Sequence, residues 1–226
     1  MRIGILQTGH APDEVQGSLG DYADMFRRLL DGHGFGFDIY NVVDGEFPAG
    51  PEAADGWLIT GSKHGAYEAH DWIPPLEDLI RAIRDSARPM IGVCFGHQII
   101  AQALGGKVEK FPGGWAVGRT EYDFGDETLA LNAWHQDQVV SLPENTQVIA
   151  SNDFCANAAL LIGDNILTVQ PHPEFTSAMI EGLITYRGKG NVPADLLDSA
   201  RADLPTPTAN AGFAARMAAF LTKGGK

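Results

Sequence analysis

The sequence has few cysteines, and it has no run of the roughly 20 apolar residues that a membrane-spanning helix needs. Its 226 residues include only Cys94 and Cys155. Two cysteines without a secretory signal are typical of free thiols in a reducing compartment, so we expect a cytoplasmic protein. Metal-ligand spacings of the Cys-x-x-Cys or His-x-x-x-His type are also missing. We therefore expect no metal and no cofactor; His64 and His70 flank a loop that fits a zinc site only weakly.

Basic residues are scarce as well. The chain has 16 Lys and Arg against 29 Asp and Glu, which gives a formal net charge of -13. A surface of this sign repels phosphate backbones, so the composition argues against nucleic-acid binding. The sequence also lacks a phosphate-binding G-x-x-x-x-G-K-[ST] loop and a dinucleotide fingerprint.

Apolar residues, by contrast, are abundant enough for one sizeable core. They make up 44% of the chain, which suits a single domain over residues 1–226. Strand patterns alternate with helix patterns in the first half, with strands at 2–6, 37–43, 57–60 and 90–93 and helices at 21–30 and 73–87. This alternation predicts an α/β fold with a doubly wound, mostly parallel open sheet and helices on both faces.

The second half begins with short strands rather than with β-α units. They are expected at 107–110, 115–124, 129–133, 147–152, 158–162 and 166–170. Their succession predicts a small antiparallel extension whose last strand returns to the main sheet. Helices follow from residue 176, at 194–204 and at 210–221, before a tail at 222–226 that we expect to fray.

The most informative stretch is Gly92-Val93-Cys94-Phe95-Gly96, where an apolar strand gives way to an amphipathic helix. Two glycines around a central nucleophile permit the tight turn that lifts its side chain clear of a sheet. The N-terminus of the following helix would direct N–H groups and a positive dipole end at the sulfur, which favours the thiolate. The alternative is a small buried cysteine that closes a strand.

A thiolate nucleophile also needs an imidazole nearby and a group that orients the imidazole. The segment Gln170-Pro171-His172-Pro173-Glu174 follows the last apolar strand. Alternate residues of an extended segment project to the same side, so His172 and Glu174 can lie close together. Taken alone, the segment is typical of a surface loop with a His–Glu ion pair. Together with the cysteine motif in the same chain, it favours an active site.

These two motifs resemble those of the class I, triad-type glutamine amidotransferases. The resemblance covers about residues 1–185 and leaves a C-terminal helical segment at 186–226. It implies a flavodoxin-like fold and a triad of Cys94 as nucleophile, His172 as acid and base, and Glu174 as its orienter. It also implies hydrolysis of the γ-amide of glutamine through a γ-glutamyl thioester, with release of ammonia.

The resemblance implies further roles around the triad. The oxyanion of the reaction needs two N–H donors, one from Phe95 and the other from Gly61 or Ser62. The substrate-binding residues are expected to be Gln98, His135, Asp137, Gly114 and Trp115. The segment from Asn132 to Val139, which supplies His135 and Asp137, resembles the Trp-His-x-Asp-x-Val segment of the stand-alone, GMP-synthase-like subgroup, in which the His and Asp lie near the glutamine site. Its Trp134 equally fits a core aromatic.

Three functions are compatible with these residues. The first is a glutaminase that supplies ammonia to a separate synthetase, because residues 176–226 are too few for an ATP-dependent domain. The second is a stand-alone hydrolase of γ-glutamyl peptides or other γ-glutamyl compounds, as in plant γ-glutamyl peptidases that resemble this subgroup. The third, a non-catalytic binding module, is disfavoured by the intact Cys94, His172 and Glu174. The first two differ only in the leaving group, which the sequence does not distinguish.

Overall fold

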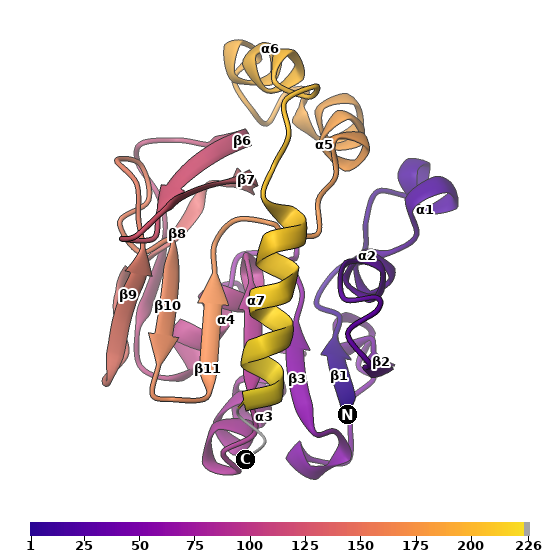
Figure 1. Ribbon diagram of the computed structural model, residues 1–226, viewed down its shortest axis with the longest axis vertical. Helices are drawn as coiled ribbons and strands as arrows, with labels where there is room; N and C mark the ends of the chain where they lie inside the picture. The colour runs from indigo at the N-terminus through magenta and orange to yellow at the C-terminus, as the bar shows by residue number, and fades with distance from the viewer. Residues whose placement is uncertain (224–226) are drawn as a thin grey trace.

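A seven-stranded sheet forms the centre of the molecule, in the order β2 (Gly36–Tyr40), β1 (Arg2–Leu6), β3 (Gly56–Ile59), β4 (Met90–Val93), β11 (Ile166–Val169), β10 (Ala159–Ile162) and β9 (Thr146–Ala150) (Figure 1). The computed structural model describes residues 1–223. The first five strands in this order are parallel, whereas β10 and β9 are antiparallel to their neighbours. The predicted doubly wound, mostly parallel sheet is therefore confirmed.

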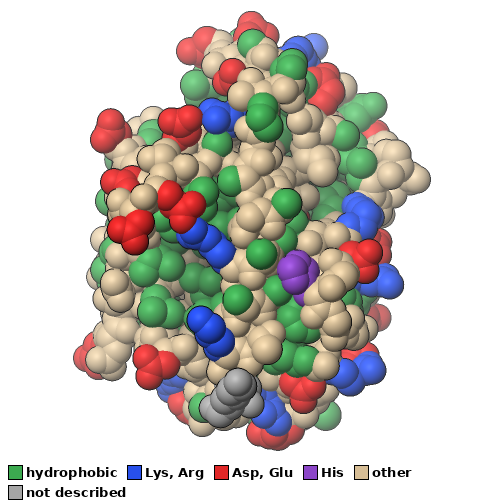
Figure 2. Space-filling model, viewed as in Figure 1, with side chains coloured by type: hydrophobic (Ala, Val, Ile, Leu, Met, Phe, Trp, Pro, Cys, Tyr) green, Lys and Arg blue, Asp and Glu red, His purple; other side chains and the backbone are tan. Residues whose placement is uncertain are grey.

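Helices cover both faces of this sheet. Those on one face are α2 (Tyr22–Leu29) and α7 (Asn210–Lys223), which crosses in front of the strands in Figure 1. Those on the other are α3 (Ile73–Asp85) and α4 (Phe95–Ala103). Every residue of β3, β4 and β11 is buried, as the continuous apolar runs of these central strands require. Figure 2 shows the outer surface of the α7 face, where charged side chains surround the apolar ones.

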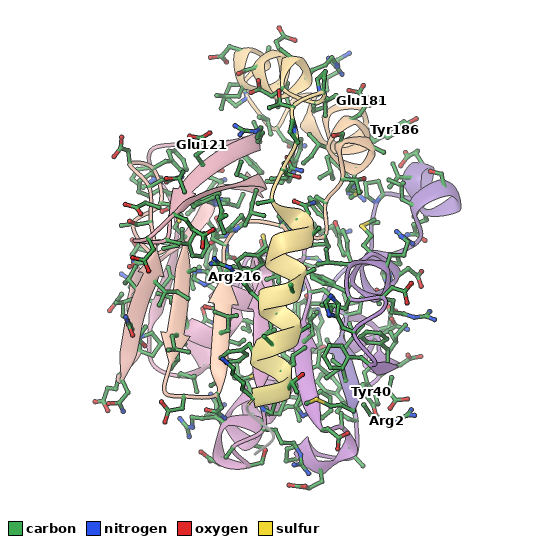
Figure 3. All side chains as sticks on the ribbon, viewed as in Figure 1. Arg2, Tyr40, Glu121, Glu181, Tyr186 and Arg216 are labelled. Atoms are coloured by element: carbon green, nitrogen blue, oxygen red, sulfur yellow. The ribbon has the colours of Figure 1, made fainter. Side chains whose placement is uncertain are left out.

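The predicted antiparallel extension is confirmed but is divided into three parts. The strands β9 and β10 extend the main sheet, while β5 (Lys107–Lys110) pairs with β8 (Asp137–Ser141) and β6 (Ala116–Asp123) pairs with β7 (Thr128–His135). Arg216, which Figure 3 labels on α7, joins the β6–β7 hairpin to this helix, because it pairs with Glu127 and lies over the ring of Phe124.

A third layer lies beyond the carboxyl ends of the parallel strands. It is formed by α1 (Asp13–Leu19), α5 (Ser177–Leu183), the π-helical turn η3 (Ile184–Gly188) and α6 (Ala194–Ala202) (Figure 1). Their apolar side chains form one cluster that also includes Trp115 and Trp134. The carboxyl ends of open parallel sheets are the usual position of binding sites, and this layer encloses that edge.

Two elements differ from the sequence prediction, and one predicted strand is shorter than expected. The loop predicted at 8–12 is present, but the helix α1 that follows it from Asp13 was not predicted; Val15 is its only buried residue, so it lacks an amphipathic pattern. The strand β8 was not predicted, and it pairs only with the short β5. The strand predicted at 37–43 ends at Tyr40, because Val42–Asp44 form a 3-10 turn, η1.

The end of the chain is helical for longer than expected. The tail predicted to fray begins at Thr222, but Thr222 and Lys223 complete α7, and residues 224–226 lie outside the described part. Within residues 1–223, no helix combines the length and the apolarity that a membrane crossing requires.

Candidate active site

Cys94 lies at the turn between β4 and α4, as the sequence predicts. Its backbone has φ of 54° and ψ of -105°, a conformation that side-chain-bearing residues seldom adopt. The flanking glycines allow α4 to approach the sheet closely: a Cβ on Gly92 would lie 2.5 Å from the Gly96 carbonyl oxygen, and one on Gly96 would lie 2.3 Å from the Ile59 carbonyl oxygen. The turn thus holds the cysteine at the end of a helix and at the edge of a cavity.

The structure brings His172 and Glu174 together beside Cys94. The two atoms His172 Nδ1 and Glu174 Oε1 are 2.7 Å apart, and both side chains are almost completely buried. The bond to Glu174 occupies Nδ1 and leaves Nε2 as the ring nitrogen available for proton transfer with Cys94. A Cβ on Gly61 would contact both the His172 ring and the Cys94 side chain, so these two residues face the same small space.

The electrostatics of this group favour a charged imidazole. Burial by itself lowers the pKa of His172, but the charges of Glu174 and Cys94, with hydrogen bonding to both, outweigh burial and raise it to about 10. A histidine that stays protonated near neutral pH stabilises a neighbouring thiolate.

Two residues that support His172 were not singled out by the sequence analysis. The ring of Phe175 stacks on the imidazole, with centroids 3.9 Å apart and planes 3° apart. Asn132 of β7 holds the turn at both ends, because its carbonyl accepts from His172 N at 2.8 Å and its side chain donates to Phe175 O at 2.8 Å. Asn132 belongs to the 132–139 segment that resembles a segment of the family, so the sequence did point to this region. Only the fold shows that Asn132 contacts residues 172–175.

The predicted oxyanion donors lie on either side of Cys94. Phe95 is the first residue of α4, and the first N–H groups of a helix lack intrahelical partners. Gly96 N donates to Thr60 O at 3.1 Å, which fixes the loop after β3 against the start of the helix. This contact places Gly61 and Ser62 next to the cysteine turn, and Ser62 lines the cavity.

A cavity of about 370 Å³ opens next to Cys94 and His172. Four of the five predicted substrate-binding residues line it: Gln98, Trp115, His135 and Asp137. Gly114, the fifth, does not; it occupies the turn before β6 with φ of 93°.

Several of these polar groups meet at the backbone of Asp137. Its carbonyl accepts from Gln98 Nε2 at 3.0 Å and lies 3.2 Å from His135 Nδ1. Burial lowers the pKa of His135 to about 4, so its ring is neutral at pH 7. With Nδ1–H donating to Asp137, Nε2 is an acceptor, and no described residue donates to it although it is buried. The cavity wall therefore offers an unpaired acceptor.

Comparison with known proteins identifies the family of the chain. The model of one protein family, glutamine amidotransferase class-I, matches residues 50–184. The chain belongs to that family. The match includes Cys94, His172 and Glu174, and it confirms the family predicted from the two motifs. Class-I glutamine amidotransferases and their relatives are cysteine-nucleophile hydrolases, so the chain is an enzyme of this type.

The chain is similar to proteins with different names. The chain is 34% identical over 212 residues to gamma-glutamyl peptidase 4 of Arabidopsis thaliana, covering 86% of this chain and 84% of that protein. It is also 34% identical over 138 residues to the glutamine-hydrolysing GMP synthase of an Azoarcus species, covering 54% of this chain but only 26% of that protein.

A solved structure shares the fold along nearly the whole chain. The glutamine amidotransferase of Methylobacillus flagellatus superposes with a TM-score of 0.77 at 22% identity, over 99% of this chain and 94% of that one. This likeness supports the flavodoxin-like fold of the amidotransferase family.

Proposed function

We propose that the enzyme hydrolyses γ-glutamyl amide bonds and that γ-glutamyl peptides are its substrates. Cys94 is the nucleophile, His172 the acid and base, and Glu174 the group that orients His172. The short His172–Glu174 contact and its position beside Cys94 support these roles.

The reaction proceeds through two acyl transfers. The Cys94 thiolate attacks the γ-carbonyl carbon, and the N–H groups of Phe95 and of Gly61 or Ser62 stabilise the oxyanion. The C–N bond breaks as His172 gives its proton to the departing amine, which leaves a γ-glutamyl thioester on Cys94. Water then loses a proton to His172 and attacks the thioester, so that the C–S bond breaks and glutamate is released.

The cavity wall supplies groups for the glutamyl end of the substrate. The unpaired Nε2 of His135 can accept from the α-ammonium group, and the half-buried carboxylate of Asp137 can balance its charge. Gln98 holds the backbone of Asp137, while Trp115 borders the cavity from the β6 side. Gly114 contributes through the turn that precedes Trp115.

The observation that favours a peptide over free glutamine is a set of cations at the cavity. Most described Lys and Arg residues form ion pairs with carboxylates, whereas Lys63, Lys110 and Arg187 line the cavity and form none within residues 1–223. Lys110 also attracts the carboxylate of Asp137 without a close contact. The glutamyl α-carboxylate, which both substrates carry, can bind one of these three cations; the other two have no group to bind on the leaving side of glutamine, because its leaving group is ammonia. The leaving group of a γ-glutamyl peptide carries a carboxylate, which such cations bind.

The relatives support the same choice. The protein from Arabidopsis thaliana is named a γ-glutamyl peptidase, and its match extends over most of both chains. The second candidate function is hydrolysis of glutamine for a separate synthetase subunit. It is favoured by the match to a GMP synthase, of which this chain resembles about a quarter.

The test compares three substrates: glutamine, a γ-glutamyl dipeptide with a free terminal carboxylate, and the same dipeptide with a terminal amide. We expect the free dipeptide to be cleaved with the highest kcat/KM, and Cys94→Ala to abolish turnover of all three. Replacement of Lys63 and Arg187 by alanine should lower kcat/KM for the free dipeptide about tenfold or more, because each charge-assisted bond contributes about 1.5–3 kcal/mol.

The amidated dipeptide and glutamine serve as matched controls, because both keep the glutamyl α-carboxylate but neither has a carboxylate on its leaving group. Equal losses on the free and amidated dipeptides would contradict the role of the cations. Preference for glutamine by the isolated chain would instead favour the synthetase-linked function.

A further inference from the structure

A cluster of two histidines and one glutamate lies on the loop that connects β3 to α3. His64 Nδ1 is 3.4 Å and His70 Nε2 is 2.8 Å from the same Glu68 oxygen, Oε2. The potential ligand atoms of all three residues lie within 4.8 Å of one another. The triad-type chemistry described above uses none of them.

The donor set and its spacing suit a small transition-metal ion. Two imidazoles and one carboxylate are a common three-ligand set for Zn²⁺, which leaves a fourth position for water. In a tetrahedral site with bonds of about 2.0–2.1 Å, neighbouring donor atoms are about 3.3 Å apart. The separations of 3.4 Å and 2.8 Å between the histidine nitrogens and Glu68 Oε2 lie on either side of this value, and the two histidine nitrogens lie within 4.8 Å of each other. Rotations of the side chains can therefore bring all three donors to the distances that the ion needs.

The surroundings hold the imidazoles in place. The Trp72 ring stacks on His70, with centroids 5.8 Å apart and planes 12° apart, and lies 5.9 Å from the His64 ring. Trp72 in turn packs against Phe95, with ring centroids 5.5 Å apart. The cluster is therefore connected by packing to the residue that follows Cys94.

We propose that His64, Glu68 and His70 bind Zn²⁺ at the rim of the active-site cavity. Binding replaces the two contacts to Glu68 with three coordinate bonds. Each donor nitrogen gives up any proton it carries, to solvent from a charged ring or to the other ring nitrogen in a neutral ring. His64 and Glu68 both line the cavity, and the loop that carries them also carries Gly61 and Ser62. An occupied site therefore orders the loop that supplies an oxyanion donor.

The experiment measures metal binding in Cys94→Ala protein, so that the active-site thiolate cannot contribute a ligand. We expect one Zn²⁺ per chain by calorimetry after chelator treatment. Co²⁺ should bind at the same site, give the visible absorption of a tetrahedral complex, and quench the fluorescence of Trp72. Trp72→Phe should lose this quenching while it keeps the stoichiometry. Hydrogen exchange of residues 63–71 should slow when Zn²⁺ is added.

Variants of the three ligands decide the assignment. His64→Ala, His70→Ala and Glu68→Gln should each weaken Zn²⁺ binding more than about 100-fold, since even outer-shell changes cost about 10- to 100-fold. His33→Ala, which removes an exposed histidine elsewhere, is the matched control and should bind as before. Glu68→Gln keeps the shape of the side chain, so it remains informative if an alanine variant folds poorly.

The proposal is overturned if the Cys94→Ala protein binds no Zn²⁺, or if the ligand variants bind it as well as that protein does. The loop contacts would then serve only to hold the segment together. This test is independent of the substrate, because neither outcome depends on which γ-glutamyl compound the enzyme cleaves.

Discussion

The two cysteines of the chain have different surroundings, and their reactivity should differ accordingly. Both are buried, with 5% and 2% of their surface exposed, but Cys94 borders the cavity at the N-terminus of α4, whereas burial raises the pKa of Cys155 to about 12. We expect iodoacetamide to alkylate Cys94 at least about tenfold faster than Cys155 near pH 7, measured by peptide mapping of the labelled protein. Similar rates would contradict the assignment of Cys94 as the nucleophile.

His172 should make the free energy of unfolding depend on pH in the alkaline range. Its pKa in the folded protein is about 10, against an ordinary value of 6.5, because the attraction to Glu174 and Cys94 outweighs burial. A raised histidine pKa stabilises the fold fully below pH 6.5, and this contribution disappears as the pH rises to 10. We expect the free energy of unfolding to fall across this window in denaturant titrations. Glu174→Gln should flatten the fall; an unchanged slope would show that Glu174 does not hold the proton on His172.

At the scale of elements, β7 positions the turn that carries His172. Asn132→Ala removes the side-chain bond to Phe175 O but leaves the backbone bond to His172 N. A lost buried hydrogen bond costs about 1–3 kcal/mol, so we expect kcat to fall about 5- to 100-fold with little change in KM. Asn165→Ala is the matched control, because Asn165 makes a similar bond to the Arg88 carbonyl away from the site. Equal effects of the two variants on kcat would contradict a positioning role.

The sequence predicted the parallel elements well because each has a local signal. The run at 90–93 and the glycines around Cys94 specify a strand, a turn and a helix without reference to the rest of the chain. The strand β8 had no such signal. It pairs with β5, and each residue of β5 in these pairs lies 27 or more positions before its partner in β8. The same reason hid Asn132, because its contacts with residues 172–175 depend on tertiary placement. Phe175 is only three residues from His172, but periodicity does not show that its ring stacks on the imidazole.

At the scale of the whole molecule, the C-terminal helix completes a core that begins at residue 3. The family model ends at residue 184, and the resemblance in motifs ends near residue 185. Yet Phe213, Met217 and Leu221 of α7 are buried against the same cluster as Ile3 and Val93. The segment at 186–226 is therefore part of the fold through its last helix, a relation that no motif in that segment indicated.

A charge placed between α7 and the rest of the core should strongly destabilise the protein. Met217 is fully buried, so Met217→Asp puts an unpaired carboxylate into the core, and we expect a loss of more than about 4 kcal/mol in the free energy of unfolding. Ala215→Asp, on the exposed side of the same helix, should change it by less than about 1 kcal/mol. Chemical denaturation of both variants provides the comparison. Equal losses would mean that α7 contributes through its helix alone and not through its buried face.

The parallel stacking of Phe175 on His172 has a consequence for magnetic resonance. Protons held above an aromatic ring are shielded by its circulating π-electrons, so the carbon-bound protons of the His172 imidazole should resonate upfield of those of the other six histidines. One resolved signal would then report the protonation of this residue in the intact enzyme, throughout a titration and without any label.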